Sequence, residues 1–313
     1  MLKNCIVLDS FDYVLNLFGI KQSRLVAKEF PKNVPQENFK NIGFGFIGHF
    51  SPIFLFITIV SFAHFSLFGI CIAFAFTSVY TLLMIRWSEK KHPSVNLEPV
   101  SRKDIVKGLG LVFITASVFG TAFVVSGFYI LSHLIVVKSH FSNWIAVLIS
   151  LLATDFSYYW IHRSLNHGKG RNFVSKWYRK IHVDHHTIKA LDFYRGNLSS
   201  FFDTALIGFQ VPLIFISVIL GMNLETVLTS YCLVMILQST HHANHTFNIG
   251  MLRFIFVDNH SHKLHHCPRG YSVNFGAMFA IWDIFFRTYY EEWNLSASFM
   301  AEYSIPLPIK KVK

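Results

Sequence analysis

Long apolar runs limit what this chain can fold into more than any other feature of its sequence. Residues 44–85 are almost wholly apolar, and two further apolar runs cover about 109–137 and 144–160. A membrane-spanning helix needs ~20 such residues. The first run therefore predicts two spans joined by a turn near His64–Ser66, and the other runs predict a third and a fourth span.

The predicted fold class is all-α. We expect an integral membrane bundle of about four transmembrane helices, with a histidine-rich helical cap on the cytosolic side. A weaker apolar pair, at about 201–220 and 224–237, predicts a re-entrant or interfacial hairpin. The expected segments are four. Residues 1–43 form an N-terminal cytosolic or interfacial stretch, and residues 44–137 contain the first three spans. Residues 138–290 contain the fourth span and the histidine-rich domain, and residues 291–313 form a basic tail.

Charge indicates the sidedness of the protein. The formal net charge is +11, and cytoplasmic loops of membrane proteins accumulate Lys and Arg, so no nucleic-acid partner is expected. With an even number of crossings, the basic loops and every histidine cluster share the cytosolic side. The start of the chain does not resemble a signal peptide and could lie on the membrane as a short amphipathic helix. The four cysteines show no paired spacing, which argues against a disulfide framework.

The motif H-x-x-H-H occurs twice in the polar part of the chain. On a helix, positions i, i+3 and i+4 share one face, so each copy directs three imidazoles the same way. Imidazole is a poor core filler and a good metal ligand. Because only 17 of 313 residues are histidine, two copies by chance are improbable. The predicted ligands in these motifs are His182, His185, His186, His262, His265 and His266.

A looser pair, His162 and His167, directly follows the fourth predicted span. Five residues on a helix correspond to about 140° of rotation, so both can serve one site only if the helix bends or ends between them. Asp155, within the span, lies on the face of His162. A carboxylate there is costly and usually functional, and we expect it to hold a ligand imidazole in one tautomer.

A third cluster contains His241, His242 and His245. His242 is the preferred ligand because Gln238 and His245 lie one turn from it on either side, but the other two histidines stay open as alternatives. With His242 the donors number nine. One zinc ion takes at most four ligands in a structural site, so nine nitrogen donors suit two metals with open positions, and imidazole is compatible with Zn, Cu, Ni and Fe.

These motifs, in this order, resemble the fatty acid hydroxylase/sterol desaturase superfamily of membrane di-iron oxygenases. The resemblance covers about residues 109–290. It includes the segment from Asp155 to Arg163, the two H-x-x-H-H motifs, the segment from His242 to Asn244, and a closing signature from Asn274 to Tyr289.

The resemblance implies two non-heme iron ions held by the nine histidines, with O₂ as co-substrate. The activity would be hydroxylation or desaturation of a C–H bond in a membrane lipid such as a sterol, an acyl chain or an alkylglycerol. Electrons would come from a separate donor of the cytochrome b5 or ferredoxin type. The location would be the endoplasmic reticulum in a eukaryote, where the dilysine form of Lys310–Lys313 would suit retrieval, or the inner membrane in a bacterium.

The chain departs from the family pattern at two places. Where the family often has Arg-x-His-Pro, this chain reads Arg195-Gly196-Asn197-Leu198, and Arg287 stands where a glycine is usual. Neither position is a proposed ligand, but both could border the lipid cleft. The competing hypotheses are a membrane metal-ion transporter and a non-catalytic metal-binding membrane protein. A transporter would need histidines and carboxylates deep inside several spans, whereas the triplets lie in basic, polar stretches.

Overall fold

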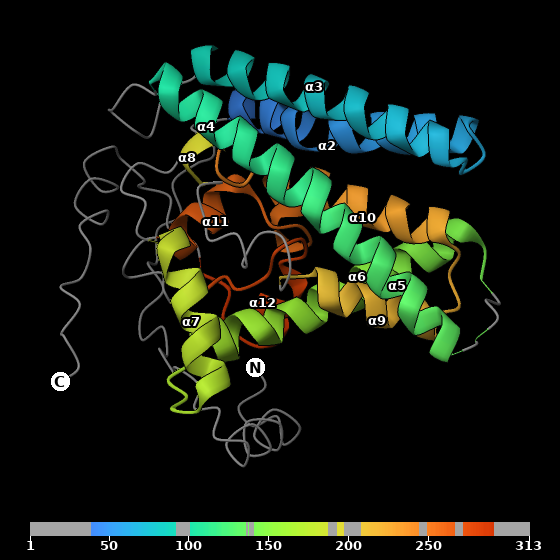
Figure 1. Cartoon of the computed structure of the whole chain (residues 1–313). Coiled ribbons are helices and arrows are strands. Elements are labelled where there is room, and N and C mark those ends of the chain that lie inside the picture. The colour runs from blue at the N-terminus through green and yellow to red at the C-terminus, as the bar shows by residue number, and fades with distance from the viewer. Residues whose placement is uncertain are drawn as a thin grey trace.

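The described part of the chain is helical and forms a bundle with a cap at one end (Figure 1). The computed structural model describes residues 39–91, 101–135, 137, 141–186, 193–196, 208–243, 249–266 and 272–290. Within these ranges the only β-type pairing is an isolated bridge between Phe256 and Phe279. The predicted all-α fold class is therefore confirmed.

Four helices are long and apolar enough to cross a membrane, as the apolar runs predict. Their apolar side chains remain largely exposed on the outer surface, for example Phe62 at 83% and Leu134 at 74%, as suits contact with lipid. The spans are Gly45–Phe62 in α2 (Phe39–Phe62), Leu67–Ser88 in α3 (Leu67–Lys91), Arg102–Leu134, and Asn143–Asn166.

The first two spans form a hairpin at the predicted turn. His64 and Phe65 adopt positive φ angles of 48° and 57° between α2 and α3. Just beyond the turn, Gly69 packs against Ala63 so closely that no Cβ would fit. A glycine at this point therefore allows the start of α3 to pack directly against the end of α2.

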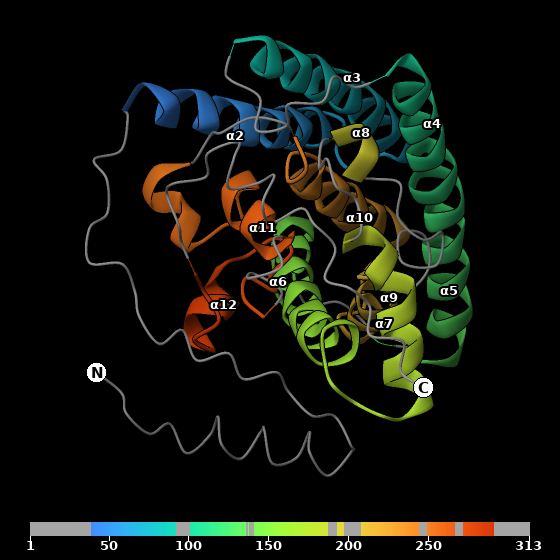
Figure 2. The ribbon, with the colours of Figure 1, turned by 90° about the vertical axis from the view of Figure 1, so that its left-hand side faces the viewer.

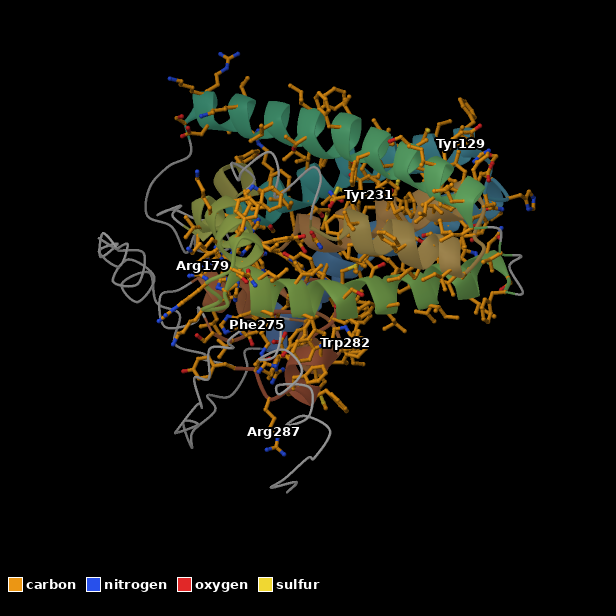
Figure 3. The ribbon with its side chains drawn as sticks, turned by 60° about the horizontal axis from the view of Figure 1, so that its bottom comes forward. Tyr129, Arg179, Tyr231, Phe275, Trp282 and Arg287 are labelled. Carbon is orange, nitrogen blue, oxygen red and sulfur yellow. The ribbon has the colours of Figure 1, made fainter. Side chains whose placement is uncertain are left out.

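The third span is one continuous helix with a π-helical middle. It consists of α4 (Arg102–Val112), the π-helix η1 (Phe113–Gly120) and α5 (Thr121–Leu134). The wider winding of a π-helix displaces backbone carbonyls from their usual donors. Here the Tyr231 hydroxyl donates to the Ala116 carbonyl over 2.7 Å, and Tyr231 lies inside the bundle in Figure 3. Gly120 contacts this hydroxyl, so its missing side chain makes room for Tyr231.

The weaker apolar pair forms α9 (Gln210–Ile219) and α10 (Leu224–Ser239). At 1.5 Å per residue, α10 is about 24 Å long, which is shorter than the ~30 Å hydrocarbon core of a bilayer. It is buried on nearly all sides and packs against α2, α3, α5, α6 (Asn143–Ile161) and α9. The predicted hairpin therefore places its second helix inside the bundle, where α10 forms the centre of the apolar core.

The cap gathers at the end of the bundle opposite to Tyr129 (Figure 3). Figure 2 views this end, with α7 and α11 close to the end of α6. The cap elements are η2 (His162–Asn166), α7 (Phe173–His186), α8 (Phe193–Gly196), η4 (Gly250–Phe254), α11 (Asn259–His266) and α12 (Ile281–Phe285).

Two sequence predictions concern residues outside the described ranges. They are the amphipathic helix near the N-terminus and the dilysine tail, Lys310–Lys313. The division into segments at 1–43, 44–137, 138–290 and 291–313 also stays a prediction.

The contact between Gly120 and Tyr231 gives a stability prediction. Gly120→Ala should lower stability by about 1–3 kcal/mol, because the added methyl group must displace the Tyr231 hydroxyl from the Ala116 carbonyl. The measurement is the thermal unfolding midpoint of the purified protein in detergent. Gly110→Ala is the matched control, since a Cβ at Gly110 in the same span meets no atom within 4 Å. An equal midpoint for the two variants would contradict this account of η1.

Candidate metal centre

Four separate segments bring nine histidines together in the cap, and these are the nine that the sequence singled out. Within the described residues they form two groups, in each of which the candidate ligand atoms all lie within 4.8 Å of one another. The first group contains His162, His167, His182, His186 and His265, and the second group contains His185, His242, His262 and His266.

Each H-x-x-H-H motif is divided between the two groups. In α7, His182 and His186 join the first group while His185 joins the second. In α11, His265 joins the first group, and His262 and His266 join the second. The two groups are neighbours, because the His186 and His266 rings stack with centroids 4.4 Å apart. Each helix therefore contributes histidines to both groups, and neither group is built from one helix alone.

The pair His162 and His167 reaches one group through a local change of winding. The fourth span ends in the π-helix η2, and the His167 N–H donates to the His162 carbonyl over 3.0 Å. This i→i+5 bond replaces the α-helical i→i+4 bond, so the two rings lie on the same side with centroids 4.9 Å apart. Gly168, placed against the Ser164 backbone with no room for a Cβ, allows the chain to leave the helix at once.

The distances between facing nitrogens test whether the groups fit a metal. Two nitrogens bound to one ion at metal–nitrogen distances of ~2.0–2.1 Å lie about 2.9 Å apart at a right angle and about 3.3 Å apart at a tetrahedral angle. In the second group the Nε2 atoms of His242, His262 and His266 form a triangle with sides of 2.9, 3.1 and 3.4 Å. In the first group the Nε2 of His182 lies 3.0 Å from those of His162 and His186.

Hydrogen bonding alone does not explain the triangle in the second group. A neutral imidazole carries one N–H, and its second nitrogen only accepts. If the three Nε2···Nε2 contacts were hydrogen bonds, the Nε2 protons would have to point into the same small space between the three rings. A cation at the centre accepts all three lone pairs at once. The donor set and its spacing therefore fit a bound transition metal ion in each group.

Backbone carbonyls fix the orientation of two first-group rings. The Nδ1–H of His162 donates to the Phe275 carbonyl, and that of His265 donates to the Val273 carbonyl, each over 2.7 Å. With Nδ1 protonated, Nε2 keeps its lone pair. The Nε2 of His265 is buried without a hydrogen-bond partner, as expected of an atom that coordinates a metal.

The segment that supplies these carbonyls is held by two buried carboxylates. Asp283 accepts from the N–H groups of Phe275 and Gly276, each over 2.7 Å. Asp155 accepts from the next three N–H groups, those of residues 277, 278 and 279, over 3.2, 2.9 and 2.9 Å. Five consecutive backbone donors are thus satisfied by two side chains.

This arrangement corrects the role predicted for Asp155. Among the described residues, its oxygens accept hydrogen bonds from three backbone N–H groups and from no imidazole. The acceptor that fixes the His162 tautomer is instead the Phe275 carbonyl. Asp155 affects His162 indirectly, because it holds the loop that carries the Phe275 carbonyl. A sequence pattern does not show which backbone carbonyl accepts a hydrogen bond, so the Phe275 carbonyl was not among the predicted site residues. Asp283 was not among them either, although it lies within the closing signature.

A buried asparagine, also absent from the predicted set, joins the ends of two ligand-bearing elements. The Asn259 side-chain N–H₂, at the start of α11, donates to the carbonyls of Thr240, His241 and Ala243 over 3.2, 2.8 and 2.7 Å. These residues flank His242 just after α10. Asn259 therefore fixes the position of His242 relative to His262 and His266.

The third cluster is partly resolved by these contacts. His242 lies in the second group, as preferred from the sequence. His241 lies in neither group, although its ring packs next to His262 with centroids 5.0 Å apart and faces His49 of α2 at 6.4 Å. The Nδ1 of His49 is 2.9 Å from the Thr240 hydroxyl oxygen. His245 lies outside the described residues.

Burial disfavours the protonated form of several histidines in the two groups. Burial, followed by the neighbouring imidazoles, lowers the pKa of His186, His262 and His266 well below 6.5. Burial likewise lowers the pKa of His265 to about 3, against the opposing effect of its bond to the Val273 carbonyl. Neutral imidazole is the form that binds metals. Because the unfolded chain would bind protons at these histidines while the folded chain would not, the free energy of unfolding should fall as the pH drops below about 6.5.

A cavity of about 420 Å³ leads from the apolar part of the bundle to both groups. Its polar end contains His162 and His182 of the first group and His185, His242 and His262 of the second group. Its apolar walls come from α3, η1 and α10, through side chains such as Phe74, Phe113, Ala116 and Met235. We call it the α3–η1–α10 cavity.

The two departures from the family pattern occupy different places. Arg287 does not border the cavity; it points away from the bundle in Figure 3 and has a φ of 59°. A positive φ favours glycine, which is a physical reason for a glycine at this position. Phe193, two residues before Arg195, does line the cavity, and residues 197 and 198 lie outside the described ranges.

The comparisons with known proteins agree with this site. Residues 147–288 match the family model described as fatty acid hydroxylase, and this segment includes all nine histidines. The segment is a fatty acid hydroxylase domain, which confirms the resemblance to the fatty acid hydroxylase/sterol desaturase superfamily. Neither the curated proteins nor the solved structures contain a match to the chain.

The role of Asp155 as the anchor of the closing loop can be tested with Asp155→Asn. One of its oxygens becomes an N–H₂ group that faces backbone N–H donors, so at least one bond is lost and one donor is left unsatisfied. We expect a loss of stability of about 2 kcal/mol or more and a lower metal content, measured by thermal unfolding and by elemental analysis. Ser157→Ala, which removes a bond within the same helix, is the control. An unchanged thermal midpoint in Asp155→Asn would exclude the anchoring role.

The assignment of His242 rather than His241 is tested by metal content. His242→Ala should lose about one of two metal ions per chain, because it removes one of the four donors of the second group. His241→Ala should retain both ions, since its ring belongs to neither group. The measurement is the metal-to-protein ratio of the purified variants. The reverse order of metal loss would show that the third cluster is assigned incorrectly.

Proposed function

We propose that this membrane protein is an O₂-dependent lipid hydroxylase or desaturase that uses two iron ions. The nine histidines would hold the irons, the first group one ion and the second group the other. The observation that carries this proposal is the α3–η1–α10 cavity, because it connects an apolar chamber inside a membrane bundle to both histidine groups. The fatty acid hydroxylase domain supports the same chemistry.

Two iron ions, when bound, would supply the activation of O₂. Hydroxylation then consumes one O₂, two electrons and two protons for each C–H bond converted to C–OH, with one water released. Desaturation with the same oxidant removes two hydrogens and releases two waters. The electrons would come from a separate donor of the cytochrome b5 or ferredoxin type, and the site would face the cytosol.

The protein itself would bind the lipid, exclude water and select the carbon that reacts. Apolar side chains of α3, η1 and α10 form walls that favour an alkyl chain over water. The position of the chain along these walls decides which C–H bond lies next to the histidine groups, since reaction requires contact between the reacting atoms. His162 and His265 donate from Nδ1–H to the carbonyls of Phe275 and Val273, which keeps their Nε2 atoms directed into the site in the absence of substrate.

The experiment is an oxygenation assay on the whole chain, purified with iron and reconstituted with mixed membrane lipids. We expect a reductant-dependent consumption of O₂ and a lipid product that has gained one oxygen or lost two hydrogens, identified by mass spectrometry. His185→Ala and His265→Ala, one from each group, should abolish the product and lower the iron content. His133→Ala, an exposed histidine of α5 outside both groups, is the control.

The competing functions give different outcomes in the same assay. A metal transporter would move iron into sealed vesicles without consuming O₂. A non-catalytic metal-binding protein would retain iron and leave every lipid unchanged. Full activity in either His185→Ala or His265→Ala would contradict the proposed function.

A further inference from the structure

Helix α7 presents metal-binding histidines on one face and a basic surface on the other. It lies across the cap end of the bundle (Figures 1 and 2). Toward the centre it contributes His182, His185 and His186. On its opposite face Lys176 and Lys180, one helical turn apart, are exposed.

The loop before α7 extends this basic surface. Lys169 and Arg171 are exposed there, and the Arg179 guanidinium donates to the Gly170 carbonyl over 2.8 Å, which holds the loop against the helix. From His162 to Val183 every side chain with a full charge is basic. Among the side chains that the structure describes, which do not include that of Asp184, no carboxylate forms an ion pair with these cations. We call Lys169, Arg171, Lys176 and Lys180 the α7 basic surface.

Exposed apolar side chains adjoin these cations. Phe173 is 80% exposed and Val174 is 49% exposed at the start of α7. A small apolar area surrounded by charges of one sign is typical of an interface that forms and dissociates quickly. Single exposed apolar residues are common, but here they lie between Arg171 and Lys176 in the sequence.

The basic surface lies within one helix of both histidine groups. An α-helix with its side chains is about 10–12 Å thick, so a protein resting on the outer face of α7 would approach the ligand histidines to about that distance. Small electron-transfer complexes use interfaces of this transient kind. Trp177 and Tyr178, both half-buried, lie between Lys176 and Lys180 in the same helix.

We propose that the α7 basic surface is the docking site of an acidic electron-transfer protein. The proposal rests on the proposed function, which requires two electrons for each lipid oxidised. Two one-electron deliveries by the reduced donor, which leaves oxidised each time, supply them. Charge complementarity brings the donor to α7, and the thickness of one helix separates it from the centre it reduces.

The test uses the whole chain, loaded with iron, in nanodiscs of phosphatidylcholine. The soluble heme domain of cytochrome b5 is the donor, with a plant-type ferredoxin in a parallel series. The variant Lys176→Glu/Lys180→Glu reverses the charge of the exposed face of α7. The matched control, Arg102→Glu/Lys103→Glu, reverses two exposed cations at the start of α4, which lies apart from α7 in Figures 1 and 2.

At low salt, the donor concentration for half-maximal rate should rise ~10-fold or more in the α7 variant, because electrostatic steering governs such encounters. The difference should shrink at about 0.15 M salt, where charges are screened beyond ~8 Å. Product formed with dithionite as the reductant should be unchanged, and so should the α4 control. Lys176→Gln/Lys180→Gln should give an intermediate effect, which a defect in folding would not.

Three results would overturn the docking proposal. The first is an equal response of the α7 variant and the α4 control. The second is an effect that depends on added phosphatidylserine, which would reflect contact with anionic lipid. The third is a loss of dithionite-driven product in both α7 variants. If the unsubstituted protein forms no product even with dithionite, the result contradicts the proposed oxygenase function and not only the docking site.

Discussion

The convergence of nine imidazoles is the constraint on which the cap depends. Uncharged histidines without a ligand would be poor core residues, and their facing nitrogens would leave lone pairs directed at one another. The triangle of His242, His262 and His266 and the contacts of His182 with His162 and His186 have the spacing of atoms that share a cation. The surrounding loops serve this geometry, because each ring must be held before any metal can be bound by all of them.

The sequence predicted the elements of the fold well because apolar length is a local property. The four spans, the turn at His64–Ser66 and the hairpin of α9 and α10 all follow from runs of residues that need no long-range information. The central position of α10 did not follow from its sequence. An apolar helix of 16 residues has the same composition whether it lies at an interface or inside a bundle.

The nine histidines could also be identified in advance, since helical spacing places i, i+3 and i+4 on one face. Their division could not, because which ring of α7 meets which ring of α11 depends on how the two helices cross. Asp155 was recognised as important from its cost inside a span, yet its partners proved to be backbone N–H groups, which carry no sequence signal. The role of Asn259 carries no sequence signal either, because its three acceptors are backbone carbonyls.

The bond between Asp155 and the closing loop has a consequence for how the protein is made. Its partners follow it by 122 to 124 residues, so the fourth span leaves the ribosome with a carboxylate whose hydrogen-bond donors do not yet exist. Residue 279 must be translated before this charge is satisfied and before the Phe275 carbonyl can orient His162. The histidine groups are therefore completed late in biogenesis, because His162 is oriented only after the closing loop has been translated.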